Sequence, residues 1–298
     1  MRALLATLSL LAVSCTSTLS SREPSPMTSP TAPTKTGYAH VNGLSLYYEV
    51  RGSLADGGTP LVLLHGGLHN TLLDAPVAAR LAQGRQVISV DLQGHGRTAD
   101  ADRPLRYEQL ADDVAALLEE LRVPQADVLG YSLGGGVSLR LAIQHPSRVR
   151  KLVVVGAPFS NTGWYPEVAA AFQHLTGAIA DMMKPSPVYQ TYAAIAPDPA
   201  GFARLIDKTG ELQRRPCDWS AEVSKLSMPV LLVFADADSM PPSYIAQFYG
   251  LLGGGQRDGG LDGSGRPKSS LAILPGRTHY DLFESPAMVA AVEPFLGR

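Results

Sequence analysis

The feature that most restricts how this chain can fold is a Gly-x-Ser-x-Gly sequence at Gly130–Gly134, centred on Ser132. An apolar run ending in Val128-Leu129 precedes it, and a helical pattern from Val137 to Gln144 follows. Because glycine has no Cβ atom, the chain can turn sharply here and the helix can pack close to the strand. The pattern predicts a strand–turn–helix unit that projects the Ser132 hydroxyl from the sheet edge, beside the amides of a helix N-terminus.

Strands and helices are predicted to alternate along most of the chain. Two alternating segments joined by Asn42-Gly43 predict a β-hairpin between Gly37 and Arg51. The apolar run Leu61–Leu64 is typical of a strand buried on both faces of a parallel sheet. Further strands are predicted at 86–91, 149–155, 229–234 and 271–274, and helices at 107–121 and 285–295. This alternation predicts an α/β fold with right-handed crossovers.

The composition fits one large globular domain that carries an insertion. The chain has 298 residues, of which 45% are hydrophobic and 17% charged, so it can bury a single large core. A net charge of -2 gives no basic surface for nucleic acid. We therefore expect small neutral or apolar compounds as ligands.

The N-terminus has the pattern of an export signal. Arg2 precedes an apolar run from Ala3 to Val13, which is too short to span a bilayer as a mature helix. The sequence predicts a signal peptide over 1–14, a flexible Ser/Thr/Pro-rich linker over 15–36 and a folded domain over 37–298. Ala-Val-Ser-Cys15 resembles a bacterial lipoprotein cleavage box, which leaves a lipid anchor at Cys15 and plain cleavage as alternatives. Either one predicts a periplasmic or extracellular protein, membrane-bound only through Cys15.

Two stretches interrupt the alternation of strands and helices. Residues 157–220 are rich in proline, aromatic residues and methionine, which predicts a cap of short helices that encloses an apolar pocket. Gly253 to Ser269 is glycine-rich but has neither a phosphate-loop ending nor a spaced acidic ligand set, so a surface loop is expected there.

A serine hydroxyl becomes a strong nucleophile only when a base accepts its proton, so the sequence must also supply a histidine and an acid. His279 lies between the last predicted strand and the last predicted helix, at the sheet edge that carries Ser132. The acid is expected after strand 229–234, where Asp238 is preferred and Asp236 is the alternative, read as a turn-forming residue. The other histidines are assigned structural roles or have no accompanying motif: His40, His65, His69, His95, His145 and His174.

An oxyanion needs two preorganised backbone amides. The residue after the serine, Leu133, is expected to supply one, and the glycine loop after strand 61–64 the other, from Gly67 or else Leu68. Candidates for the wall of the substrate pocket are Leu68, Tyr131, Phe159 and Trp164.

Several ordered motifs together resemble the α/β-hydrolase superfamily, and within it the capped esterase and non-haem haloperoxidase-like group. They are Leu-Leu-His65-Gly-Gly-Leu, Asp91-Leu-Gln-Gly-His-Gly-Arg, Gly130-Tyr-Ser-Leu-Gly-Gly, His145-Pro-Ser-Arg-Val, Ala235-Asp-Ala-Asp238 and Gly276-Arg-Thr-His279. The resemblance implies an eight-stranded, mostly parallel sheet with helices on both faces and a helical cap after strand six. It also implies hydrolysis through an acyl-enzyme with no metal or organic cofactor.

Ser132 in the nucleophile position distinguishes this chain from the haloalkane dehalogenases and epoxide hydrolases it otherwise resembles, which have an aspartate there. We expect a serine hydrolase that acts on a small acyl substrate such as an ester or lactone with an apolar part. A perhydrolase or carbon–carbon bond hydrolase on the same three residues is the first alternative. A ligand-binding protein with little turnover is the second, and the sequence makes no prediction of oligomeric state.

Overall fold

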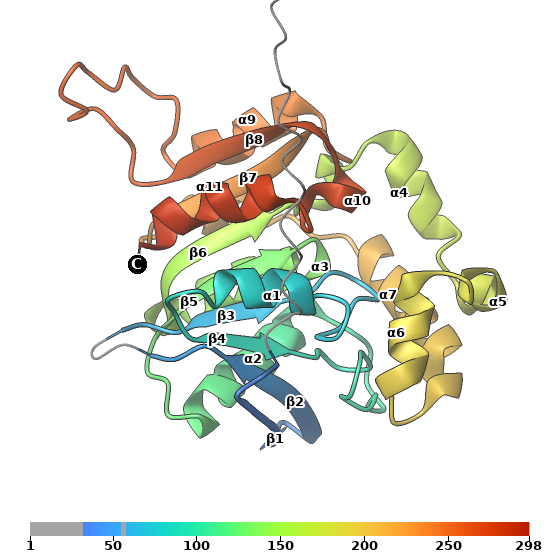
Figure 1. Ribbon diagram of the computed structural model, residues 1–298. Helices are drawn as coiled ribbons and strands as arrows, with labels where there is room; N and C mark the ends of the chain where they lie inside the picture. The colour runs from blue at the N-terminus through green and yellow to red at the C-terminus, as the bar shows by residue number, and fades with distance from the viewer. Residues whose placement is uncertain (1–31, 55–57, 298) are drawn as a thin grey trace, which may run out of the picture.

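The computed structural model describes residues 32–54 and 58–297 of the chain. The expected signal peptide, the Cys15 cleavage box and most of the expected linker lie outside these residues. The described residues form an eight-stranded sheet in the order β1-β2-β4-β3-β5-β6-β7-β8 (Figure 1). Only the β1–β2 and β2–β4 pairs are antiparallel. The predicted fold class, an eight-stranded and mostly parallel α/β sheet, is confirmed.

The strands and helices follow one another along the chain in the predicted alternation. The strands are β1 (Lys35–Val41), β2 (Leu44–Arg51), β3 (Leu61–Leu64), β4 (Val87–Val90), β5 (Ala126–Tyr131), β6 (Val149–Val155), β7 (Val230–Ala237) and β8 (Ser270–Thr278). The helices of the α/β core are α1 (Ala75–Leu81), α2 (Tyr107–Glu120), α3 (Leu133–Gln144), α9 (Pro242–Leu251), α10 (His279–Leu282) and α11 (Pro286–Leu296). Those between β6 and β7 are α4 (Pro166–Gln173), α5 (Ala180–Met183), α6 (Pro187–Ile195), α7 (Phe202–Arg214) and α8 (Ser220–Val223).

The core forms two layers, one on each face of the sheet. Side chains alternate along a strand, so Val62 and Leu64 of β3 join the core that α2, α3 and α9 cover. Leu61 and Leu63 point the other way and pack with α1 and α11. Figure 1 shows α1 and α11 together on the near face. Burial on both faces explains why the central strands are continuous apolar runs.

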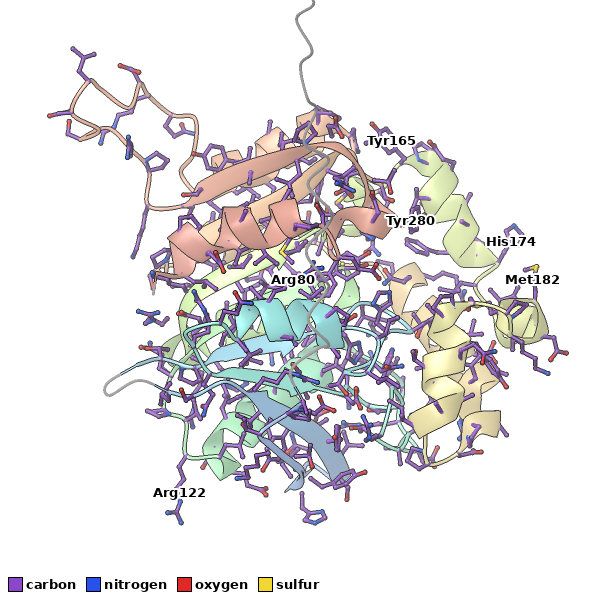
Figure 2. The ribbon with its side chains drawn as sticks, viewed as in Figure 1. Arg80, Arg122, Tyr165, His174, Met182 and Tyr280 are labelled. Atoms are coloured by element: carbon purple, nitrogen blue, oxygen red, sulfur yellow. The ribbon has the colours of Figure 1, made fainter. Side chains whose placement is uncertain are left out.

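Short helices between β6 and β7 form a cap at one end of the sheet (Figure 1). Helix α7 is its best-buried part, because Phe202, Leu205 and Ile206 lie on its inner face. Lys208 of α7 fastens the cap to the core through a 2.7 Å ion pair between its Nζ and Asp100 Oδ2. The α4–α5 end is far less covered: Met182 is 74% exposed and points outward in Figure 2.

Three element boundaries differ from the sequence predictions by three residues or more. Helix α3 begins at Leu133 rather than Val137, because the glycines at 134–136 form its first turn against the sheet. Strand β7 continues to Ala237, so Asp236 lies in a strand rather than in a turn. Strand β8 runs to Thr278, because the chain bulges between its pairings Ala235 to Leu274 and Ala237 to Thr278 and then resumes the ladder.

The glycine-rich loop at 253–269 leaves the body of the protein before β8 (Figure 1). Gly253, Gly255, Gly260 and Gly263 have positive φ angles there, which only glycine adopts at little cost. Among the described residues, no helix is long and apolar enough to cross a membrane.

Candidate active site

Ser132 occupies a sharp turn between β5 and α3. Its φ of 50° and ψ of -113° are unfavourable for a residue with a side chain, and such strain persists only where the surroundings enforce it. Its N–H donates to the Val155 carbonyl at 2.9 Å. A Cβ atom on Gly130 would overlap the Gly134 carbonyl, and one on Gly134 would overlap the Leu64 and His65 carbonyls. The two glycines therefore allow the close strand–helix contact that holds Ser132 in this conformation.

The structure brings Ser132, His279 and Asp238 together in one hydrogen-bonded chain. His279 is the first residue of α10, its Nε2 lies 3.1 Å from Ser132 Oγ and its Nδ1 lies 3.0 Å from Asp238 Oδ1. The Asp238 side chain is fully buried, and it accepts further hydrogen bonds from the N–H groups of Ala235 and Ser239 at 2.9 and 2.8 Å. The carboxylate is thus fixed from three sides and holds the imidazole against the serine.

Asp236, the alternative acid, does not reach His279. Its exposed carboxylate accepts hydrogen bonds from the N–H groups of Gly276 and Arg277 at 2.9 and 3.1 Å. These bonds lower the pKa of Asp236 and tie β7 to the bulge of β8, three residues before His279. Asp236 therefore supports the backbone that leads to the histidine.

The glycine loop after β3 offers one amide for an oxyanion. The Leu68 N–H donates to His95 Nε2 at 3.2 Å, whereas the Gly67 N–H has no acceptor among the described residues. This difference favours Gly67 over the alternative, Leu68. The second candidate amide belongs to Leu133, the first residue of α3, where a helix N–H has no acceptor within the helix.

Two buried histidines support this loop. His65 Nδ1–H donates to the Gly66 carbonyl and its Nε2 accepts from the Leu92 N–H, and His95 is bonded in the same way to Gln93 and Leu68. Burial lowers the pKa of His65 to about 4 and that of His95 to about 3. Both rings are neutral near pH 7 and act as structural hydrogen-bonding groups, as the sequence predicts.

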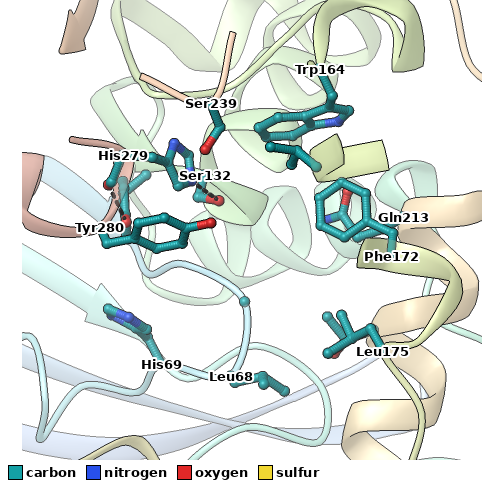
Figure 3. Close-up of a pocket in the computed structure, with 14 residues that line it drawn as sticks. Leu68, His69, Ser132, Trp164, Phe172, Leu175, Gln213, Ser239, His279 and Tyr280 are labelled. Atoms are coloured by element: carbon teal, nitrogen blue, oxygen red, sulfur yellow. Dashed lines mark hydrogen bonds between the residues drawn. The ribbon is translucent and has the colours of Figure 1, made fainter. Parts of the chain in front are cut away.

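A cavity of about 180 Å³ opens above Ser132, between the glycine loop and the cap. Three of the predicted wall residues, Leu68, Tyr131 and Trp164, line it. Phe159 does not, because its ring is buried and stacks on Tyr244 at 4.6 Å between ring centroids. Figure 3 shows Trp164 and Phe172 facing Ser132 across this space.

The rest of the lining comes from residues that the sequence analysis did not single out. The cap supplies an apolar wall from Val168, Phe172 and Leu175, and the polar side chains of Thr209 and Gln213 from one face of α7; His69, Ser239 and Tyr280 complete the lining. The sequence signal that could have identified Thr209 and Gln213 as lining residues was their four-residue spacing, because it places both side chains on one side of a helix. Among the described residues, no group of three His, Cys, Asp or Glu side chains is arranged to hold a metal ion.

Comparison with known proteins places the chain among enzymes of one fold. The family model described as alpha/beta hydrolase fold matches residues 59–181. The pimeloyl-[acyl-carrier protein] methyl ester esterase of Neisseria meningitidis serogroup B (strain ATCC BAA-335 / MC58) is 30% identical over 217 residues, which are 66% of this chain and 82% of the esterase. A crystal structure of a hydrolase from Pseudomonas aeruginosa PA01 superposes with a TM-score of 0.64 at 22% identity, over 89% of this chain and 99% of that one.

Other curated relatives match over a shorter part of their length. The 2-hydroxymuconate semialdehyde hydrolase of Pseudomonas sp. (strain CF600) is 38% identical over 114 residues, which are 36% of this chain and 40% of that enzyme. The chain thus spans less than half the length of this enzyme, and it spans 32% of another relative, the dihydrolipoyllysine-residue acetyltransferase component of acetoin cleaving system of Pseudomonas putida.

Proposed function

The chain belongs to the α/β-hydrolase superfamily, and on this premise we propose that it is a serine hydrolase that cleaves carboxylic esters or related acyl compounds through an acyl-enzyme. The observation that carries the proposal is the hydrogen-bonded chain from Asp238 through His279 to Ser132, at the base of a largely apolar cavity. Nucleophile and base are within hydrogen-bonding reach, and a third group orients the base.

In the proposed reaction, Ser132 Oγ attacks the acyl carbon while His279 Nε2 accepts the hydroxyl proton. The Gly67 and Leu133 N–H groups stabilise the oxyanion of the tetrahedral intermediate. His279 then returns the proton to the leaving alcohol, and the acyl group stays on Ser132. Water deprotonated by His279 hydrolyses this ester and regenerates the free serine. Throughout, Asp238 stabilises the imidazolium that forms at His279.

The cavity supports a substrate with an apolar part. Trp164, Phe172 and Leu175 present apolar surface opposite Ser132, and burying such surface favours binding by about 25 cal/mol per Å². The Neisseria relative is a methyl ester esterase by name, which agrees with a carboxylic ester as the substrate of this chain.

The test is steady-state hydrolysis of 4-nitrophenyl esters with acyl chains from two to twelve carbons, by the wild-type protein and by Ser132→Ala. We expect turnover by the wild type with an optimum at short chains, and a loss of turnover in the variant while its circular dichroism spectrum is unchanged. Equal turnover by both proteins would rule out Ser132 as the nucleophile.

A carbon–carbon bond hydrolase is a second candidate, supported by the similarity to the 2-hydroxymuconate semialdehyde hydrolase. The same serine, histidine and oxyanion amides serve that reaction. 2-Hydroxymuconate semialdehyde, the compound in that relative's name, distinguishes the two proposals, because it has no ester bond for an esterase to cleave. A perhydrolase would instead form peracid from the ester in hydrogen peroxide. Labelling of Ser132 by a fluorophosphonate without turnover of any of these substrates would favour a binding role.

We also propose that the protein is exported and that its N-terminus is processed near Cys15. Arg2 and the apolar run to Val13 support a signal peptide, and the Ser/Thr/Pro-rich segment after Cys15 supports a tether. The mass of the mature N-terminus, together with cell fractionation in a bacterial host, tests this. A protein that retains Met1 and stays in the cytoplasm would contradict it.

A further inference from the structure

A second histidine–carboxylate pair lies beside the cavity, separate from Asp238 and His279. His69 Nδ1 is 2.9 Å from Asp74 Oδ1. The Asp74 side chain is 4% exposed, whereas that of His69 is 19% exposed and lines the cavity. Figure 3 shows His69 on the side of Tyr280 and His279, across from Phe172 and Leu175. The reaction proposed above uses neither member of this pair.

Backbone contacts hold the pair in place. The His69 N–H donates to the Gly66 carbonyl at 3.1 Å, which closes a turn that also contains Gly67, the expected oxyanion donor. Asp74 directly precedes α1, and its carbonyl accepts from Val77 at 3.0 Å. The pair therefore has a fixed position relative to the acyl carbonyl that Gly67 is expected to bind.

One ring nitrogen of His69 is available to a ligand. An ionised carboxylate only accepts hydrogen bonds, so the His69 Nδ1–H donates to Asp74 Oδ1 and the proton stays on Nδ1. The other nitrogen, Nε2, has no hydrogen-bond partner in the described part of the chain. When the ring is charged, Nε2–H is a free cationic donor at the edge of the cavity.

His69 is also the one basic group outside the proposed catalytic residues that lines this cavity. The described lining residues include His69 and His279 but no lysine, arginine, aspartate or glutamate. The Tyr131 ring lies between the two histidines, 5.7 Å from His69 and 5.6 Å from His279 between centroids. Both histidines therefore border the same tyrosine ring and the same cavity, so that one ligand that fills the cavity contacts both.

Its surroundings favour the charged form of His69. Burial alone lowers the pKa of His69, but the charge and hydrogen bond of Asp74 and the charge of Glu284 outweigh burial, so the pKa is raised above its ordinary value. The other titratable groups that face it are Tyr131 of β5, Tyr280 of α10, and the buried, neutral His65 and His95.

We propose that His69 binds a carboxylate on the acyl part of the substrate, so that the preferred substrates are monoesters of short dicarboxylic acids. This inference rests on the proposed function and narrows its substrate class. The ester carbonyl lies at Ser132 and the apolar chain follows the cavity. The free carboxylate then accepts a hydrogen bond from His69 Nε2, which Asp74 holds in orientation through Nδ1.

The test compares three 4-nitrophenyl esters of equal chain length: hydrogen adipate, the neutral adipamate and the neutral hexanoate. We expect kcat/KM for the adipate to exceed that for the adipamate by about 10- to 100-fold at pH 6.5, the range for one charge-assisted hydrogen bond. The ratio should fall as the pH rises and His69 loses its charge. Because both esters use Ser132 and His279, titration of the catalytic residues cancels in this ratio.

His69→Gln should bring the adipate-to-adipamate ratio close to one, mainly through KM for the adipate. His174→Gln, the same substitution at an exposed histidine of the cap that points to solvent in Figure 2, should leave the ratio as in the wild type. Labelling of Ser132 by a fluorophosphonate checks that each variant keeps a working nucleophile.

The outcomes separate the two proposals. If the wild type hydrolyses hexanoate and adipamate but shows no preference for adipate, the role of His69 is wrong while the serine hydrolase stands. A preference that survives His69→Gln, or that does not depend on pH, also overturns it. If none of the esters is hydrolysed and Ser132 is not labelled, the proposed function itself fails.

Discussion

Replacing Asp238 with asparagine tests the role of the buried carboxylate. In the structure its Oδ1 faces two N–H donors, His279 Nδ1 and the Ser239 amide, and its Oδ2 faces a third, the Ala235 amide. An asparagine has one acceptor oxygen and one NH2 group. In either orientation, the NH2 group meets at least one of these donors, and the negative charge beside His279 is lost.

The two orientations of the asparagine fail for different reasons. When the asparagine oxygen faces His279, the ring keeps its tautomer but the imidazolium loses its counter-charge. The N–H of Ala235 then faces the asparagine NH2 group, which is another donor. With its NH2 group toward His279, the ring must carry its proton on Nε2, which can then no longer accept the proton of Ser132. In a well-studied serine protease the corresponding change costs about 10⁴-fold in kcat, which corresponds to about 5 kcal/mol of transition-state stabilisation.

Asp236→Asn is the matched control, since it is the same substitution two residues away. The Asp236 carboxylate accepts hydrogen bonds from two backbone N–H groups of the β8 bulge, and an asparagine oxygen can keep one of these bonds. We expect kcat within a few-fold of the wild type and a small decrease in Tm.

Both variants are assayed for kcat on the same 4-nitrophenyl ester, after circular dichroism has shown that they are folded. An Asp238→Asn protein that retains more than about a tenth of the wild-type kcat would refute the reasoning, because it would mean that the carboxylate neither selects the tautomer nor stabilises the imidazolium. If Asp236→Asn were the more damaged variant, the assignment of the acid would have to change.

Three further predictions follow from the packing and the buried charges. Gly134→Ala places a Cβ atom against the carbonyls below the turn and should lower Tm sharply or abolish soluble expression, whereas wild-type Tm in thermal denaturation would contradict the close contact. Tm should rise with pH between about 4 and 6.5. Burial lowers the pKa of His65 and His95 to about 4 and about 3, so in this range the unfolded chain binds two protons that the folded chain does not. Burial also raises the pKa of Asp91 to about 6, so the folded chain binds one proton there and offsets one of the two; a flat or opposite Tm profile would show that these groups titrate normally. Phe172→Ala removes part of the apolar wall and enlarges the cavity. It should shift the optimum in kcat/KM toward longer acyl chains, which a series of 4-nitrophenyl esters measures.

Most of the core architecture could be predicted because it depends on local patterns. Alternation around Asn42-Gly43 specifies the hairpin, and the observed φ angles of 48° and 79° are those of a turn that needs both residues in the left-handed region. The Gly-x-Ser-x-Gly pattern fixes the turn at Ser132 through backbone contacts that only glycine allows. Such signals act over a few residues, so the sequence displays them directly.

The wall of the cavity was harder to predict, because it depends on packing between distant segments. Phe159 has the chemistry of a pocket residue, but it is buried against Tyr244 of α9, 85 residues later in the chain. His69 had no motif of its own. Its pairing with Asp74 requires a turn in which Leu68 adopts a φ of 65°, a conformation that residue type alone does not indicate.

The measurement that tests the central claim most directly is the site of covalent modification by a fluorophosphonate, read by intact mass and peptide mapping. The account predicts a single adduct at Ser132, because within the described residues 32–54 and 58–297 this is the hydroxyl that lies 3.1 Å from an imidazole oriented by a buried carboxylate. Its formation should be slowed by Asp238→Asn and abolished by Ser132→Ala. A protein that hydrolyses esters while Ser132 remains unmodified, or that is modified at another residue, would contradict the account.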